Sequence, residues 1–80
     1  TQYRADVEKY ERLMEKDQEV ILLRESIAKT ASSQLDNGVI TSSDYVSRLN
    51  EKTQAKLDLE VHRVKLARAR VDYLTSLGIL

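Results

Sequence analysis

The stretch Leu35-Asp36-Asn37-Gly38-Val39-Ile40-Thr41-Ser42-Ser43-Asp44-Tyr45 decides the fold, because here the backbone has a reason to reverse. Gly38 lacks the Cβ that makes a positive φ costly, so it predicts the end of a helix. Thr41 and Asp44 have the spacing of a capping box, in which each side chain accepts a hydrogen bond from the other residue's amide. Ile40 and Tyr45 flank the cap as a hydrophobic staple. The stretch therefore predicts a turn at about residues 37–41 between two helices.

Before the turn, a seven-residue repeat predicts one helix over about residues 2–36. Two rows follow this repeat: Val7, Met14, Ile21, Ala28 and Leu35, and Tyr3, Tyr10, Asp17, Arg24 and Ala31. Asp17 and Arg24 interrupt the second row, so we expect them to weaken a two-stranded zipper. A third row consists of Leu13, Val20 and Ile27, and residues 20–23 are apolar nearly all round. A helix of this kind is expected to need more than one neighbour.

After the turn, a second helix is predicted over about residues 42–77, with Gly78 closing it. One apolar row includes Leu57, Val64 and Val71, and the other includes Leu59, Leu66 and Tyr73. Residues two positions apart are separated by roughly 200° around a helix, so these rows lie on opposite sides. The sequence thus predicts an all-α, antiparallel hairpin of coiled-coil type, formed by residues 1–80 as a single unit.

The composition suits long solvated helices and excludes several classes of function. The 80 residues include 32% charged and 41% hydrophobic residues, with two glycines and no proline or cysteine. Lys plus Arg and Asp plus Glu number 13 each, so no net charge attracts nucleic acid. Pairs such as Glu8–Arg12 and Glu25–Lys29 have helical salt-bridge spacing. Because the apolar spacing begins at once, without an initiator Met, we interpret the chain as a piece of a larger protein.

The residues give no support to an enzyme, a metal site or a cofactor site. The single histidine, His62, lies between Leu59 and Leu66, and no second His or Cys is available as a ligand. We expect a packed or surface histidine, which Asp58 could orient by a hydrogen bond. The serines have no His–Asp partners at the spacing of a nucleophile, and no glycine-rich phosphate loop is present.

The turn and its flanks resemble the TolC-like outer membrane efflux protein family. The resemblance is most specific over residues 31–46, followed by Leu49-Asn50, and it covers most of the chain from about Tyr10 to Gly78. It implies a homotrimeric channel with an outer-membrane β-barrel and a periplasmic helical tunnel. This segment would be one hairpin of the tunnel wall, in the periplasm and outside the membrane itself. Such channels work with an inner-membrane pump and a periplasmic adaptor protein.

The resemblance also assigns roles to residues at the turn. It implies that Gly38, Val39, Ile40 and Thr41 form the tip that docks the adaptor. Asp44 takes the place of an acidic residue that narrows the channel aperture, while a capping role for it is equally expected from its position. The place of a second acid has Ser47 here. A Tyr–Arg tether of the closed aperture would fall at Leu35 and Ile40, so that tether is not preserved.

Two other functions fit a helical hairpin. One is the hairpin of the adaptor itself, although an adaptor usually has an Arg before its tip and the nearest base here is Lys29. The other is a structural coiled coil with no role in transport. In every case, apolar rows on opposite sides of a helix predict that the isolated chain self-associates.

Overall fold

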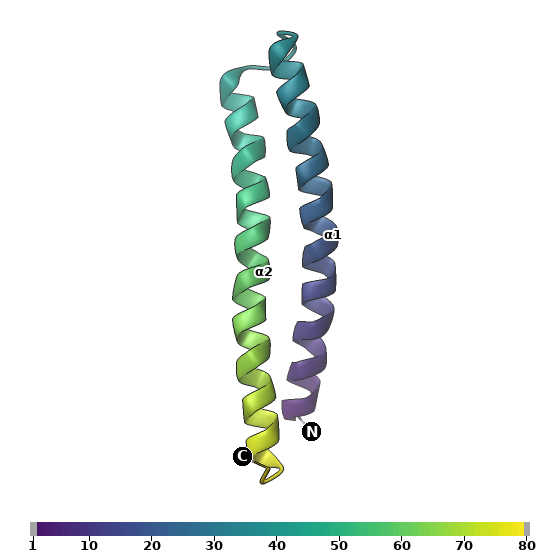
Figure 1. The fold of residues 1–80 in the computed structure, drawn as a ribbon, viewed down its shortest axis with the longest axis vertical. Helices are drawn as coiled ribbons and strands as arrows, with labels where there is room; N and C mark the ends of the chain where they lie inside the picture. Colours follow the sequence, from purple (N-terminus) through teal and green to yellow (C-terminus); the bar gives the residue numbers. More distant parts are fainter. Residues whose placement is uncertain (1, 80) are drawn as a thin grey trace.

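The computed structural model describes residues 2–79 and shows two helices packed antiparallel. Helix α1 spans Gln2–Asp36 and helix α2 spans Ser42–Ser76. The chain reverses once, so both ends lie together at the end opposite the turn (Figure 1). The molecule measures 61 × 15 × 14 Å. The predicted all-α hairpin is confirmed, with no strand among the described residues and α2 ending one residue before the predicted position. Residues 1 and 80 of the predicted unit lie outside this description.

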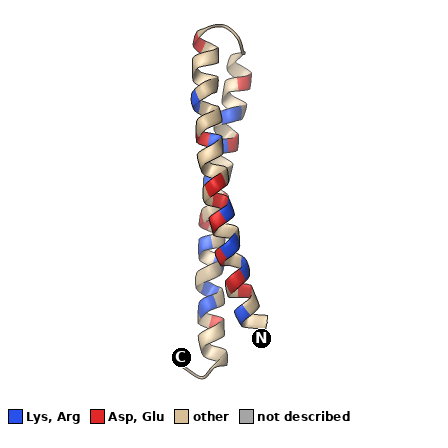
Figure 2. Ribbon diagram, turned by 90° about the vertical axis from the view of Figure 1, so that its right-hand side faces the viewer, with Lys and Arg blue, Asp and Glu red and all other residues tan. Residues whose placement is uncertain are grey.

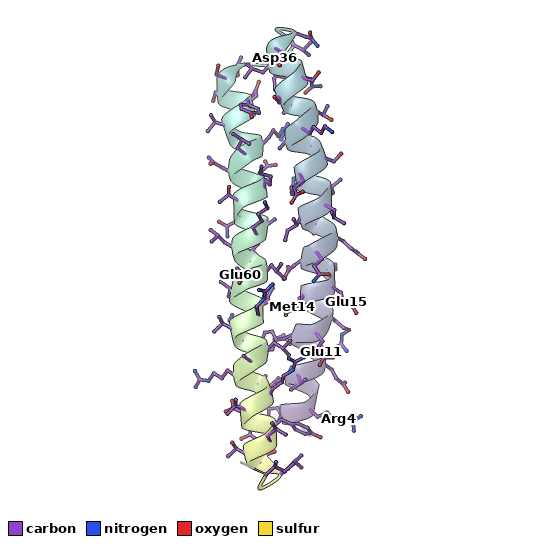
Figure 3. The ribbon with its side chains drawn as sticks, viewed as in Figure 1. Arg4, Glu11, Met14, Glu15, Asp36 and Glu60 are labelled. Carbon is purple, nitrogen blue, oxygen red and sulfur yellow. The ribbon has the colours of Figure 1, made fainter. Side chains whose placement is uncertain are left out.

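The contact between the helices follows the heptad rows. Both rows of α1 that end at Leu35 and Ala31 are half-buried or buried, except at the exposed Tyr3 near the open end. On α2, the row that contains Leu59, Leu66 and Tyr73 faces α1. Figure 3 shows the Met14 side chain between the helices, whereas Glu15, one residue later, points away from α2. We call this contact the inner seam.

The fully buried part of the inner seam is small and rich in alanine. It consists of Ala28, Ala31, Ala55, Leu66 and Ala69. Alanine has no side-chain atoms beyond Cβ, so it lets helix backbones approach closely but buries little apolar area. A monomeric hairpin therefore gains limited stability from its own core.

A second apolar row remains uncovered on α2. Leu57, Val64 and Val71 are 53%, 69% and 52% exposed, although Leu59 and Leu66, two residues after the first two, face α1. The predicted opposition of the two rows is thereby confirmed. On α1, Leu22 and Leu23 are also exposed, which agrees with the prediction that this helix is apolar nearly all round.

Ion pairs between the arms line one edge of the inner seam. Lys56 Nζ lies 3.6 Å from Glu25 Oε1, and Arg70 Nη2 lies 3.7 Å from Glu11 Oε1. The expected helical partner of Glu25, Lys29, is not used, because α2 brings Lys56 closer. Glu8 likewise pairs with Arg4 at 3.3 Å and not with Arg12. Charged residues are distributed along both helices (Figure 2), and pairs this exposed contribute little to stability.

Candidate functional site

The tip of the hairpin closes α1 with a hydrogen-bonded turn. Gly38 has φ +71°, and its N–H donates to the Leu35 carbonyl at 3.0 Å. The Val39 N–H donates to the Gln34 carbonyl at 2.8 Å. Together these bonds form a Schellman motif, which needs a residue with positive φ just past the helix end. The predicted role of Gly38 is confirmed, and Gly78 closes α2 in the same manner with φ +76°.

Tip residues are presented to solvent, with one exception. Val39 is 68% exposed, and no atom lies within 4 Å of the place where a Cβ on Gly38 would be. Ile40 is half-buried, as is its expected staple partner Tyr45, and Thr41 is exposed. The four residues assigned to the docking tip thus form a continuous turn, in which the apolar side chain of Val39 is exposed and that of Ile40 is half-buried.

Thr41 and Asp44 form the predicted capping box at the start of α2. The Asp44 N–H donates to Thr41 Oγ1 at 3.1 Å, and the Thr41 N–H donates to Asp44 Oδ2 at 3.2 Å. Asp44 also places negative charge in the first turn, where the helix dipole favours it. The box fixes the angle at which the chain enters α2, so the tip is held from both sides. Asp44 remains exposed, which leaves its carboxylate accessible to a partner.

The inner seam contains a polar pair that sequence reasoning missed. His62 Nδ1 lies 2.5 Å from Asp17 Oδ2, and the two side chains are only 23% and 15% exposed. The ring of Tyr10 lies beside His62, with 6.4 Å between the ring centroids. The expected partner Asp58 is wrong, because its exposed carboxylate accepts from Gln54 Nε2 at 2.9 Å. Asp17 therefore orients the histidine from the opposite arm.

Arg24, the other interruption of the heptad row, is also paired across the seam. Its Nη1 donates to Glu51 Oε2 at 3.0 Å, and Arg48 approaches the other oxygen of Glu51 at 3.6 Å. Both pairs could have been found from the position of the turn. Folding the arms about it brings Asp17 to the height of His62, and Arg24 to a height similar to that of Glu51. In the described residues, no buried side-chain polar atom lacks a hydrogen-bond partner.

Residues 2–79 contain neither a cluster of metal ligands nor a membrane-crossing helix. No group of three His, Cys, Asp or Glu side chains in residues 2–79 is placed to hold a metal ion. Neither α1 nor α2 combines the length and apolar character that a membrane-crossing helix needs. The chain matches no family model, no curated protein and no solved structure.

Proposed function

We propose that this chain is a tunnel-wall hairpin of a TolC-like outer-membrane efflux or secretion channel, and that its tip docks a periplasmic adaptor protein. The parent would be a homotrimer in the bacterial outer membrane, with this segment in the periplasm and an inner-membrane pump as a further partner. The hairpin would act as a structural and docking element and not as an enzyme. The proposal rests first on the resemblance over residues 31–46.

The observation that best supports docking is the form of the tip. An apolar side chain, Val39, projects from a turn whose backbone is fixed by the Schellman motif before it and the capping box after it. A preorganised turn loses little conformational freedom on binding, so more of the contact energy becomes affinity. The open space around Gly38 lets another backbone approach the turn closely.

The uncovered rows on both arms support a place in a wall. A helix with apolar rows on opposite sides needs a neighbour on each side, and here only one side of α2 is covered by α1. A hairpin inside a tunnel wall would have such neighbours. An adaptor hairpin is less well supported, since the nearest base before the tip is the exposed Lys29.

Substitution of Gly38 in the parent protein tests the docking role. Gly38→Asp places a charged side chain on the tip, and Gly38→Asn places a neutral one of the same shape with the same positive φ. We expect Gly38→Asp to abolish adaptor crosslinking and efflux complementation, while Gly38→Asn retains more of both. Equal efflux by the Gly38→Asp variant and the unsubstituted protein, at equal protein level, would refute adaptor docking at this tip.

Asp44 requires a separate comparison, because it caps α2 whatever else it does. Asp44→Asn keeps a side-chain oxygen for the Thr41 amide and removes the charge. If Asp44 narrows an aperture by its charge, Asp44→Asn alters the passage of ions through the parent channel without loss of helix stability. Unchanged conductance would leave Asp44 as a capping residue alone.

A further inference from the structure

Each helix has a second heptad-spaced row that the other helix leaves largely exposed, although Leu13, Ile27 and Gln34 on α1 and Leu74 on α2 are half-buried. We call these rows the outer seams. The α2 outer seam consists of Val46, Asn50, Thr53, Leu57, Glu60, Val64, Ala67, Val71 and Leu74. The α1 outer seam consists of Leu13, Lys16, Val20, Leu23, Ile27, Thr30 and Gln34. Both rows alternate steps of three and four residues, which is the spacing that packs one helix along another.

The large apolar residues of the two outer seams lie at the same height. The cross-arm pair Glu25–Lys56 places Leu23 of α1 near the level of Leu57 of α2. Leu23 is 58% exposed, and Leu57 borders a shallow hollow on α2 that Val61 and Val64 also line. The exposed apolar surface therefore forms a belt at mid-length, with one part on each arm.

Charge decides between the two ways in which a second copy could cover this surface. Lys56, Arg63 and Arg70 follow one edge of the α2 outer seam, and each is paired within its own chain, with Glu25, Glu60 and Glu11 respectively. Pairing two α2 outer seams in opposite directions would bring Lys56 of each copy near Arg63 of the other, so this contact adds like charges and no new opposite charge across it. An α2–α2 contact between copies is therefore disfavoured.

Contact with the α1 outer seam of another copy avoids this repulsion. If two hairpins lie side by side and point the same way, Leu57 meets Leu23 and Asn50 meets Thr30. Apolar residues therefore face apolar residues, and polar residues face polar ones. Lys16 of the second copy then lies against Val64, where its aliphatic stem covers apolar surface and its ammonium group can reach Glu60. Arg63 lies near the level of Glu19 of the second copy, which is again an opposite charge.

We infer that the chain assembles by packing its α2 outer seam on the α1 outer seam of a second copy, with both hairpins pointing in the same direction. The contact is heterologous, because each copy offers a different surface to each neighbour. It extends the general expectation of self-association to a specific pair of surfaces. The inference depends on the exposed residues of the hairpin and not on the proposed transport role, so either can fail without the other.

Two substitutions test the pairing. Leu57→Glu and Leu23→Glu each place a carboxylate on one outer seam at an exposed position, and circular dichroism checks that the helices persist. By sedimentation at high micromolar concentration, we expect assemblies for the unsubstituted chain and monomers for each variant. A mixture of the two variants should form one-to-one dimers, because each variant keeps the seam that the other has lost. If the copies met through an α2–α2 contact instead, the Leu23→Glu variant would remain dimeric, and mixing would not restore association of the Leu57→Glu variant. That result would overturn the inference.

Disulfide trapping tests the direction of the contact in a chain that has no cysteine of its own. Lys9→Cys is mixed with a longer, tagged Val71→Cys chain, since residues 9 and 71 lie at similar heights in hairpins that point the same way. A disulfide requires the two Cα atoms within roughly 7 Å, so it reports close approach. The matched control is Glu8→Cys, which lies on another face of α1. If Val71→Cys forms a disulfide with Thr30→Cys and not with Lys9→Cys, the two hairpins point in opposite directions and the inference is overturned. A monomeric unsubstituted chain would overturn it as well.

Discussion

At the scale of single residues, Asp17 and His62 show how a heptad position can hold a polar side chain. A coiled coil normally places apolar residues at such positions, and a lone carboxylate there would lose solvation without compensation. Here the carboxylate of Asp17 receives a hydrogen bond from the opposite arm, whether the histidine ring is neutral with hydrogen on Nδ1 or is protonated. The pair favours one alignment of the arms, because sliding one helix along the other would separate both partners.

Breaking this pair on one side should therefore cost more than removing both partners. His62→Leu leaves the Asp17 carboxylate unpaired at 15% exposure, and we expect a loss of about 1–3 kcal/mol in the free energy of unfolding. The double variant Asp17→Leu/His62→Leu restores an apolar row and should recover most or all of that loss. Urea unfolding at one fixed protein concentration provides the measurement. A double variant less stable than His62→Leu would contradict the argument.

At the scale of the helix, the capping box gives α2 a defined first residue. Thr41→Ala removes the oxygen that accepts from the Asp44 N–H but keeps the Thr41 carbonyl, to which the Tyr45 N–H donates at 3.1 Å. We expect a loss of about 1 kcal/mol in stability. Amide hydrogen exchange should show faster exchange at Asp44, while Tyr45, whose acceptor remains, changes much less. An unchanged Asp44 exchange rate would show that its protection does not come from the cap.

Local patterns along the chain were sufficient to predict the helices and the turn. The heptad rows, Gly38 and the capping box each depend on neighbours within one or two turns of helix, so sequence spacing alone specifies them. The pairing of Asp17 with His62 was missed for a physical reason. It depends on how the two arms align, and helical spacing within one arm pointed instead to Asp58, which accepts from Gln54.

The charged partners of Glu8 and Glu25 show the same limit. Helical spacing offers Glu8 two possible bases, Arg4 and Arg12, and offers Glu25 only Lys29. It gives no information about a base on the other arm. Glu8 uses Arg4 and Glu25 uses Lys56. Exposed pairs differ from one another by a few tenths of a kcal/mol, so sequence spacing does not select among them.

At the scale of the whole molecule, the hairpin is long and thin, and many of its large apolar side chains are exposed. An antiparallel pair of helices has one shared face, and in this chain the fully buried residues of that face are four alanines and Leu66. The bulkier leucines and valines of the outer seams would contribute to stability only when another helix covers them. Folding and assembly should therefore be linked in the isolated chain.

Linkage of this kind makes thermal stability depend on protein concentration. Association that occurs only between folded chains raises the melting temperature as concentration rises. We expect the melting temperature of the unsubstituted chain, followed by circular dichroism, to increase over a hundredfold range of concentration, whereas that of Leu57→Glu stays constant and lies lower. Val39→Glu is a suitable control, since it adds a charge at an exposed apolar position on the tip and leaves both outer seams intact. If the melting temperature of the unsubstituted chain does not change with concentration, the inner seam stabilises the hairpin by itself. The exposed outer seams would then serve a partner other than a second copy.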